Sequence, residues 1–510
     1  MRALLSVYDK TDLVNFAEGL RGLGVELLAS GKTHKVLTDN NIESREVATL
    51  TDTPEMLDGR VKTLHPAIHA GILADRNKAS HMQDLEVNGI SPIDIVVCNL
   101  YPFVESPGIE MIDVGGPTMV RAAAKNHQCV TVIVDPSDYG KVLDELRSLG
   151  AVSPETRTML ARKAFAHTAA YDAAIVSWFD EGMSDDESTQ LPPTLHLSIA
   201  KAEALRYGEN PHQVGARYSL INAKPSVFDT MTQLSGKELS YLNLFDAEAA
   251  WVLAHDVISL APDKKSGVVI VKHANPCGVA VGDNIYAAYE AAYNADPLSA
   301  FGGIVAIPAT LDMKLAEAIA ANHLCDVLVA YHVDEDALAH IAGKRKNTRI
   351  LTMNPPERPK LSLRQLGTDF LVQQPDTFVS QKSDFRVVTH TEPNEEQWND
   401  LELAWRTCAR TTSNAITIAA NGQVNGIGCG QQSRVDAAVL ACKKAGERAH
   451  GAVAASDAYF PFRDGLDVLV DAGVTAVIQP GGSLRDEEVI NAANERGITM
   501  VFTAERHFRH

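Results

Sequence analysis

The sequence of 510 residues has no cysteine pattern typical of a zinc site or a disulfide framework. Its seven cysteines are odd in number, widely spaced and without a C-x-x-C pair, which is typical of reduced thiols in the cytoplasm. Long apolar runs are also missing. The opening residues MRALLSVYDKTDL contain too short an apolar run for a signal peptide, and no segment approaches a membrane span. We therefore expect a soluble, cytoplasmic protein that needs no membrane and no metal.

Positive charge is scarce as well. The chain has 46 Lys and Arg residues against 65 Asp and Glu residues, a net charge of −19. This balance argues against a nucleic acid or an anionic membrane as the main partner. Phosphate groups would need local basic pockets, so clusters of Lys and Arg are informative here. The length exceeds one ordinary core, and two or three domains are expected.

The first part of the chain alternates short β-branched or Leu-rich runs with amphipathic segments. This alternation predicts an α/β fold with a mostly parallel sheet. Residues 180–198 (DEGMSDDESTQLPPTLHLS) are acidic, contain Ser and Pro and have no period, so they predict a linker. The predicted strands are 3–7, 25–29, 95–100 and 130–134, and the predicted helices are 12–23, 35–40, 139–149 and 160–179.

We accordingly expect an N-terminal domain over residues 1–185, a linker over 186–199 and a second α/β region over 200–510. The second region would contain two subdomains, approximately 200–360 and 361–510, because residues 354–385 are rich in Pro and charge. A degenerate duplication of two α/β units is compatible with this pattern, although one sequence does not establish it.

A Lys–His pair follows a buried strand in the second region. In the run VVIVKHANPCG, four apolar residues are followed directly by Lys272 and His273. Ligands of open α/β sheets bind beyond the carboxyl ends of strands. A histidine near neutral pH is the usual general base. The alternative is a strand that simply ends where it meets water.

Three loops of the first domain combine basic groups, glycine and aromatic residues. The Ser30–Thr33 loop (SGKT) precedes a predicted helix, as an anion site would, but Glu26 replaces the glycine that a Walker A motif needs. Residues 54–71 crowd two cations and two histidines together, which favours a phosphate or carboxamide pocket over a metal pair. Residues 99–126 place Tyr, Asp and Lys around a Gly-Gly turn, which suits proton transfer.

The second region has further polar loops. LRYGENPHQ (205–213) is dense in polar groups without a period, and residues 414–436 predict a hairpin with Asn421-Gly422 at its turn. The glycine string after that hairpin is weak evidence for a dinucleotide site, because no βαβ unit precedes it. SDAYFPFRDG (456–465) offers an aromatic wall. The terminal RHFRH predicts a docked, phosphate-facing end.

Residues 54–71 together with 112–126 closely resemble the N-terminal domain of the bifunctional family that joins IMP cyclohydrolase to AICAR transformylase. The resemblance covers essentially the whole chain. It implies a methylglyoxal-synthase-like domain followed by two cytidine-deaminase-like α/β subdomains. It also implies formyl transfer from 10-formyltetrahydrofolate to AICAR, closure of formyl-AICAR to IMP, and a homodimer with transformylase sites at its interface. HANPC is followed by Gly278 rather than by x-x-C, so no zinc is expected.

For the first domain, the resemblance implies a ribotide and phosphate site and a reacting end. Lys62 and an Asp113–Lys125 pair would handle the alkoxide and the amide proton, with Tyr101 positioning. Two departures, Lys32 in the phosphate loop and a short 104–111 segment, leave open a weakened cyclohydrolase. The implied ribotide-binding residues are Ser6, Lys10, Ser30, Gly31, Thr33, Arg60, Lys62 and Thr63, and the reacting end is lined by Asn99, Tyr101, Asp113 and Lys125.

For the second region, the resemblance implies His273 as general base, Lys272 as the group that stabilises the tetrahedral oxyanion and Asn414 as the residue that orients the formyl group. A non-catalytic ribotide-binding protein is the alternative, and it would need no base. Thr412, where bacterial relatives often have Lys, is a minor departure. The implied AICAR- and folate-binding residues are Arg206, Tyr207, Phe301, Gly302, Asp326, Ser433, Arg434, Tyr459, Arg506 and His510.

Overall fold

The computed structural model describes residues 1–51, 61, 63–183, 191–221, 223–259 and 266–510. These residues form two compact units. The N-terminal unit comprises Met1–Ala200 and Leu220–Ala223, and the C-terminal unit comprises Lys201–Ser219 and Lys224–His510. No helix of the described residues is long and apolar enough to cross a bilayer.

The N-terminal unit is built on a five-stranded sheet in which every strand pair is parallel, which confirms the predicted fold class. Alternate residues of the first strand enter different cores: Ala3 and Leu5 join the core that contains Phe16 and Val142, while Leu4 joins the core that contains Ile68 and Met119. The strand order is β3 (Arg45–Glu46), β2 (Glu26–Ala29), β1 (Arg2–Ser6), β4 (Ile95–Cys98), β5 (Thr131–Ile133). The helices are α1 (Leu13–Gly22), α2 (Gly31–Asp39), α3 (Ala48–Thr51), α4 (Pro66–Leu73), α5 (Ala79–Val87), α6 (Gly115–Lys125), α7 (Tyr139–Leu149) and α8 (Pro154–Met183).

Two predicted boundaries differ from the structure. The helix expected over 35–40 begins at Gly31, because the SGKT loop itself forms the first turn of α2. The helix expected over 160–179 begins at Pro154, a residue whose fixed φ suits the first helical position, and extends to Met183. The first residues of the predicted linker, 180–183, therefore belong to α8. Residues 184–190 lie outside the described part of the chain.

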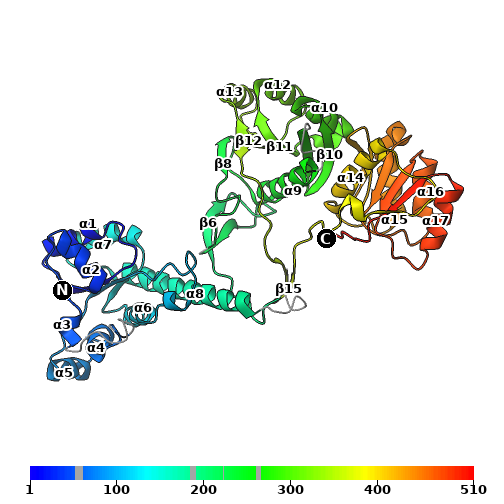
Figure 1. Ribbon diagram of the computed structural model, residues 1–510. Helices are drawn as coiled ribbons and strands as arrows, with labels where there is room; N and C mark the ends of the chain where they lie inside the picture. Colours follow the sequence, from blue (N-terminus) through cyan, green and yellow to red (C-terminus); the bar gives the residue numbers. More distant parts are fainter. Residues whose placement is uncertain (52–60, 62, 184–190, 222, 260–265) are drawn as a thin grey trace. The chain divides into compact units, whose positions relative to one another are not determined.

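The C-terminal unit is a twelve-stranded mixed sheet made of two equivalent halves (Figure 1). Each half runs strand, long helix, β-hairpin, helix, strand, helix, strand, helix, strand, and the strand order of one half is the reverse of the other about the central β10–β18 pair. The structure thus contains an internal repeat of two α/β units, a pattern that the sequence left open. The first half contains β8 (Thr232–Ser235), α9 (Tyr241–Ile258), β9 (Ser266–Lys272), β10 (Asn275–Gly282), α10 (Ile285–Ala295), α11 (Pro297–Ala300), β11 (Ile304–Leu311), α12 (Met313–Ala321), β12 (Val327–Val333), α13 (Glu335–Lys344) and β13 (Arg349–Thr352).

The second half repeats this order after a segment that carries a separate two-stranded ribbon. The ribbon is formed by β14 (Ser362–Leu366) and β15 (Asp369–Gln373). A second separate ribbon, β6 (Ile199–Leu205) with β7 (Gly215–Leu220), precedes the first half. The second half contains β16 (Arg386–Val387), α14 (Glu395–Ala409), β17 (Ile416–Ala420), β18 (Gln423–Gly428), α15 (Arg434–Ala445), β19 (Val453–Ser456), α16 (Asp464–Asp471), β20 (Ala476–Gln479), α17 (Asp486–Glu495) and β21 (Thr499–Phe502).

The two halves share one core rather than forming separate bodies. The long helices α9 and α14 pack on the same face of the sheet, where Trp251 and Trp405 are fully buried in a common cluster. The helices α10, α12 and α13 cover the other face of the first half, and α15, α16 and α17 that of the second. Strands β10 and β18 are antiparallel and pair at Ala280 and Gln423. We call this junction the seam.

Candidate functional site

Loops that follow β1 and β2 meet in the N-terminal unit. The Ser30 hydroxyl donates to the Ser6 hydroxyl at 2.8 Å, which brings the predicted anion loop onto the end of β1. Thr33 is buried, and its hydroxyl exchanges hydrogen bonds of 3.2 Å with the backbone of Val7. Thr33 therefore fixes the loop in place. Gly31, the first residue of α2, has a φ of 22°.

Positive charge converges on the same loops. The Lys10 ammonium donates to the carbonyls of Val7 and Tyr8, both at 3.1 Å. Burial and then the nearby charge of Lys32 lower the pKa of Lys10. A phosphate would relieve this repulsion between the two cations, so Lys32 adds to the basic character of the loop.

Asn99 ties the end of β4 to the β1 loop. Its side-chain oxygen accepts from the amides of Tyr8 (2.6 Å) and Asp9 (3.0 Å), and its amide nitrogen donates to the Asp9 carbonyl at 3.0 Å. Asn99 thus fixes the loop after β1, and its expected place at the reacting end stays a prediction. Tyr101, two residues later, is 43% exposed and stacks edge-on with Tyr8.

Asp113 lies two residues before α6, and its carboxylate packs directly against Gly116. Its carboxylate accepts from the Gly116 amide at 2.8 Å. Burial raises the pKa of Asp113, although hydrogen bonds from the Gly116 and Gly115 amides oppose the rise. The pKa of Tyr101 is also raised, by burial and then by the charge of Asp113. Thr63 is buried directly against Gly115.

Asp113 and Lys125, which we expected to act as a pair on the substrate, lie at opposite ends of α6, and their shared role stays a prediction. Helix α6 begins two residues after Asp113 and ends at Lys125, so at 1.5 Å per residue their backbones are about 15–18 Å apart. Two side chains of these lengths do not meet across that distance within one chain. Arg60 and Lys62, the predicted partners in this region, lie outside the described residues.

In the C-terminal unit, Lys272 ends β9 and donates to the Phe301 carbonyl at 2.8 Å. The same sheet edge carries Asp326, whose backbone bonds both the Gly303 carbonyl and the Arg349 amide. Because the sheet is mixed, this edge holds the carboxyl end of β9 but the amino ends of β11, β12 and β13. The sequence argument assumed that ligands bind beyond the carboxyl ends of strands, and this edge as a whole is not made of carboxyl ends.

His273 is exposed at the two-residue turn between β9 and β10. The turn is close to the second half of the sheet. The Asn275 side chain donates to the His273 carbonyl at 3.1 Å and accepts from the Thr412 amide at 2.8 Å. Thr412 lies two residues before Asn414. Lys272, His273 and Asn414, predicted to act together, are thus on adjoining loops from different halves.

The side chain of Asn414 is held in a defined orientation. Its oxygen accepts from Arg434 at 2.7 Å, and its amide nitrogen donates to the Gln431 carbonyl at 2.9 Å. Arg434 is itself buried and paired with the fully buried Asp457. In this arrangement Arg434 orients Asn414, and its predicted contact with AICAR stays a prediction. Ser433 caps α15 by accepting from the Asp436 amide at 3.1 Å.

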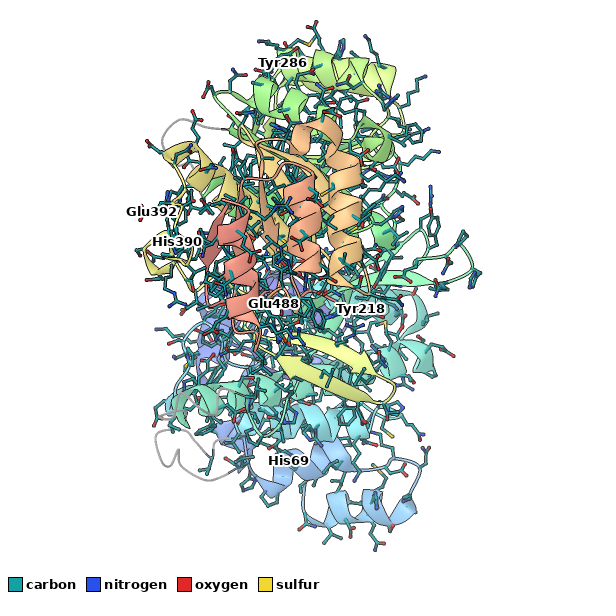
Figure 2. All side chains as sticks on the ribbon, turned by 90° about the vertical axis from the view of Figure 1, so that its right-hand side faces the viewer. His69, Tyr218, Tyr286, His390, Glu392 and Glu488 are labelled. Carbon is teal, nitrogen blue, oxygen red and sulfur yellow. The ribbon has the colours of Figure 1, made fainter. Side chains whose placement is uncertain are left out.

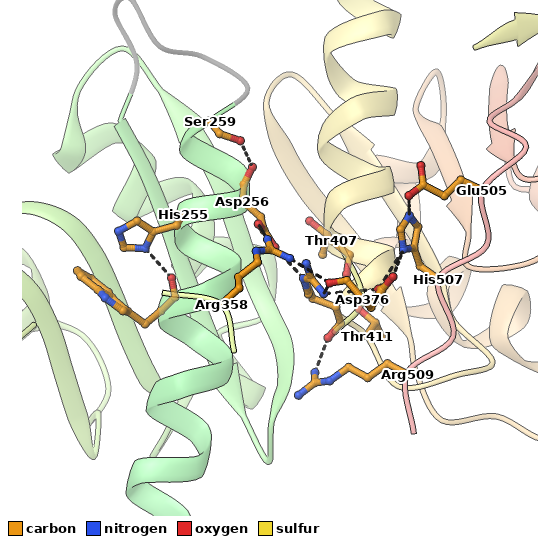
Figure 3. Close-up of polar contacts among 12 residues, drawn as sticks. His255, Asp256, Ser259, Arg358, Asp376, Thr407, Thr411, Glu505, His507 and Arg509 are labelled. Atoms are coloured by element: carbon orange, nitrogen blue, oxygen red, sulfur yellow. Dashed lines mark hydrogen bonds and ion pairs between the residues drawn. The ribbon is translucent and has the colours of Figure 1, made fainter. Parts of the chain in front are cut away.

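The C-terminal tail is docked by a network of charged side chains (Figure 3). His507 is 1% exposed and contacts the Asp376 carboxylate at 2.8 Å. Arg410 lies within 3.5 Å of Asp376 and also bonds Asp256, which pairs with Arg358. Arg506 and His510 are exposed on either side of this anchor. The C-terminal end is thus docked, as predicted from RHFRH, and its expected contact with a phosphate stays a prediction.

The remaining predicted residues are solvent-accessible. Arg206 donates to the Tyr207 hydroxyl at 2.6 Å. Sequence reasoning missed Arg349, whose pKa is lowered by burial; the charge of Asp326 opposes this effect and the charge of Arg206 adds to it. Phe301 and Tyr459 are 53% and 39% exposed, and Gly302 next to Phe301 has a φ of 72°. Sequence reasoning also missed Asp246 and Arg509. The only signal for Asp246 is an acidic residue on the apolar face of a long helix, a position where carboxylates are rare.

Comparisons with known proteins agree with this arrangement. The AICARFT/IMPCHase bienzyme model matches residues 123–444, and the MGS-like domain model matches residues 12–137. The bifunctional purine biosynthesis protein PurH of Anoxybacillus flavithermus (strain DSM 21510 / WK1) is 46% identical over 523 residues, covering 100% of this chain and 99% of the relative. A solved structure described as the crystal structure of ForH is 38% identical and covers 35% of this chain and 98% of its own, with a TM-score of 0.33. The parallel-sheet unit is thus MGS-like, as predicted, and the chain belongs to the AICARFT/IMPCHase bienzyme family.

Proposed function

We propose that the two reactions of this family are divided between the two units, with formyl transfer in the C-terminal unit and ring closure in the N-terminal unit. The chain is a bifunctional enzyme of purine biosynthesis, an AICAR formyltransferase and an IMP cyclohydrolase. We propose 10-formyltetrahydrofolate as the formyl donor. The family assignment and the exposed aromatic residues Phe301 and Tyr459 support this choice. The Phe301 carbonyl accepts from Lys272, and Tyr459 lies two residues after Asp457, whose carboxylate accepts from the Ala415 amide next to Asn414.

Formyl transfer needs a base and a positive charge at the formyl oxygen, because the amine of AICAR is delocalised into its ring and attacks weakly. His273 accepts the amine proton as the new C–N bond forms. Lys272 stabilises the oxyanion of the tetrahedral intermediate, which collapses as the bond to N10 of the folate breaks and N10 is protonated. The observation that carries this proposal is the convergence of the Lys272–His273 turn with the fixed amide of Asn414 at the seam.

Ring closure is intramolecular, so orientation and charge stabilisation are its main needs. The carboxamide nitrogen of formyl-AICAR attacks the formyl carbon, and water leaves. Asp113, with its raised pKa, is suited to exchange a proton with the reacting amide. Tyr101 is the neighbouring proton-bearing group, and the Ser6–Ser30 junction with Lys10 and Lys32 suits the ribotide phosphate.

We also propose a cytoplasmic homodimer. The ribbon β14–β15 exposes Phe370 and Leu371, each at 57%, although two isolated strands are marginally stable in water. Tyr218 on the other ribbon is 54% exposed (Figure 2). A second copy of the chain would cover these apolar groups. Seven free cysteines support a reducing compartment.

The direct test is a product assay with the substitution His273→Ala. Purified enzyme is given AICAR and 10-formyltetrahydrofolate, and formyl-AICAR and IMP are separated by chromatography. We expect wild type to form IMP, and His273→Ala to lose transfer by about 10²–10⁴-fold, the usual contribution of a general base. Binding of AICAR and closure of added formyl-AICAR should persist.

Other results would change the proposal in defined ways. Transfer that survives His273→Ala would remove His273 as the base. Accumulation of formyl-AICAR by wild type would mean that the first unit is impaired, with Lys32 the first residue to replace. No product from wild type would favour a ribotide-binding protein without turnover.

A further inference from the structure

The turn that carries His273 has an unusual backbone. His273 and Ala274 have φ values of 55° and 56°, and both are non-glycine residues in the left-handed region. A two-residue hairpin turn with positive φ at both positions is favoured by Asn-Gly or Asp-Gly sequences, because side chains with a Cβ are strained there. His-Ala has no such preference. Other groups must therefore hold this turn.

One carboxylate holds both amides of the turn. Asp246 of α9 accepts from the Ala274 amide at 2.7 Å and from the His273 amide at 3.2 Å, one bond on each oxygen. Asp246 is 8% exposed, so these bonds are little weakened by competing water. The bidentate contact is possible only while the two amides point the same way, as they do in this turn.

The second half of the sheet contains the same device. Asp400 of α14 accepts from the Asn421 amide at 2.9 Å and from the Gly422 amide at 2.8 Å, again with one bond on each oxygen. Asn421 and Gly422 also have positive φ, 55° and 72°. There the dipeptide itself prefers the turn. The carboxylate is thus a general lock on this hairpin, and the copy with the Lys–His pair depends on it most.

A second group holds the opposite side of the turn. The Arg509 guanidinium donates to the Ala274 carbonyl at 2.7 Å and also bonds the Arg410 carbonyl. Arg509 belongs to the docked C-terminal tail. Asp246 on the amides and Arg509 on the carbonyl thereby fix the peptide units on both sides of Ala274.

We infer that Asp246 is a positioning residue for formyl transfer: its carboxylate keeps the His273 turn left-handed and so holds His273 beside the Asn414 loop. This inference rests on the proposed role of His273. Without the lock, the strain at Ala274 favours other turn conformations, and the imidazole occupies the reactive position for a smaller fraction of the time.

The test compares Asp246→Asn with Asp400→Asn in the full-length enzyme. Each change leaves an oxygen for one amide and turns an NH₂ group toward the other. For Asp246→Asn we expect the kcat of formyl transfer to fall about 10- to 100-fold, as a misplaced catalytic group does, with the KM for AICAR within about twofold. For Asp400→Asn we expect a change below about threefold, because Asn421-Gly422 keeps its turn unaided.

The double variant Asp246→Asn/Ala274→Gly separates positioning from other effects. Glycine adopts positive φ freely, so it should restore at least about half of the lost kcat on a logarithmic scale if the carboxylate acts by holding the turn. Ala274→Gly alone should keep near-normal kcat. Thermal melts of all variants show whether each is folded. If Asp246→Asn does not fold, the double variant is compared with Ala274→Gly instead.

Two results would overturn the inference. Equal kcat for Asp246→Asn and Asp400→Asn would show that the lock at His273 has no special role. A large loss with no recovery on adding glycine would assign Asp246 an electrostatic effect instead. Failure of the proposed function is distinguishable, because it would appear as full transfer activity in His273→Ala, whatever the Asp246 variants do.

Discussion

Gly116 lies where any side chain would displace the carboxylate of Asp113. A Cβ added at Gly116 would be 2.3 Å from Asp113 Oδ2 and 2.8 Å from Leu100 Cδ2, both closer than real contacts. The same glycine supplies the amide that Asp113 accepts. One residue therefore controls both the position and the hydrogen bonding of the carboxylate proposed to act in ring closure.

We predict that Gly116→Ala impairs ring closure selectively. Because Asp113 must move, the kcat for conversion of formyl-AICAR to IMP should fall about 10- to 100-fold, while formyl transfer to AICAR is unchanged. The two rates are measured separately on the same preparation. Gly140→Ala is the matched control, since Gly140 is exposed in α7 with nothing within 4 Å of an added Cβ. An equal loss in both activities, or in both variants, would contradict the assignment.

At this scale, the sequence led to predicted site residues, but their hydrogen-bond partners within the chain could not be predicted. Thr33 and Asn99 both bond the loop after β1, and their contact with substrate stays a prediction. Lys125 was paired with Asp113, although a helix separates them. Hydrogen-bond partners depend on tertiary distances that a motif does not contain. Asp246 escaped notice because its partners, two backbone amides, leave no pattern in the sequence.

Among the elements, the two hairpins pack against the helices that follow them through equivalent glycines. A Cβ on Gly278 of β10 would be 2.1 Å from the Ala292 carbonyl of α10, and a Cβ on Gly426 of β18 would be 2.2 Å from the Ala441 carbonyl of α15. Each glycine lies four residues after the second residue of its hairpin turn, Ala274 or Gly422. Close helix–strand packing thus requires glycine at the same place in both copies.

We predict that Gly426→Ala destabilises the C-terminal unit. The added methyl group must push α15 away from β18, and overpacking of this kind typically costs about 1–3 kcal/mol. Urea unfolding followed by fluorescence measures the loss as a lower midpoint at an unchanged slope. Gly343→Ala in α13 should be neutral or slightly stabilising, because nothing lies within 4 Å of its Cβ. A fully stable Gly426→Ala protein would mean that α15 adjusts freely.

Hairpins and helices were predictable where their signals are local. Asn421-Gly422 forms the predicted turn, and Tyr139–Leu149 is the predicted α7. The His273-Ala274 turn was not predicted, because its conformation comes from Asp246 and Arg509 rather than from its own residues. Pairing of β10 with β18 was equally invisible, since it joins residues that are far apart in the chain.

For the molecule as a whole, each unit has its own cores and should respond to acid separately. Lys163 of α8 contacts Asp135 at 2.6 Å and Asp138 at 2.7 Å. Burial alone would raise the pKa of Asp135, but hydrogen bonds from Lys163 and Ser137 and the charge of Lys163 outweigh it and lower the pKa to about 2. The folded-state pKa is thus below the unfolded value of about 4. This stabilisation is present above about pH 4 and is lost as the pH falls toward 2.

We predict that Lys163→Met lowers the melting temperature of the N-terminal unit by about 2–4 °C at pH 7, since a partly exposed pair contributes about 1 kcal/mol. The difference from wild type should shrink as the pH falls from 4 to 2. Calorimetry and the residual activities after heating distinguish the units. Lys163→Arg should behave like wild type. A shift of formyl-transfer activity along with cyclohydrolase activity would show that the units unfold together.

The fold class and the family were predictable at this scale because long polar motifs and strand–helix alternation can be recognised in a single sequence. The continuous sheet was not, since each half reads as an ordinary α/β unit. Boundaries were off where the linker composition overlapped a helix end, as at residues 180–183.

The repeat in the C-terminal unit has an evolutionary consequence. Two hairpins that share one geometry but are encoded separately can diverge, so a substitution in one leaves the other intact. One hairpin has Asn421-Gly422, whose turn forms without strain, and the other has Lys272 and His273 followed by a strained alanine. The repeat thereby lets one turn carry reactive side chains while the equivalent turn forms from the preference of its own residues.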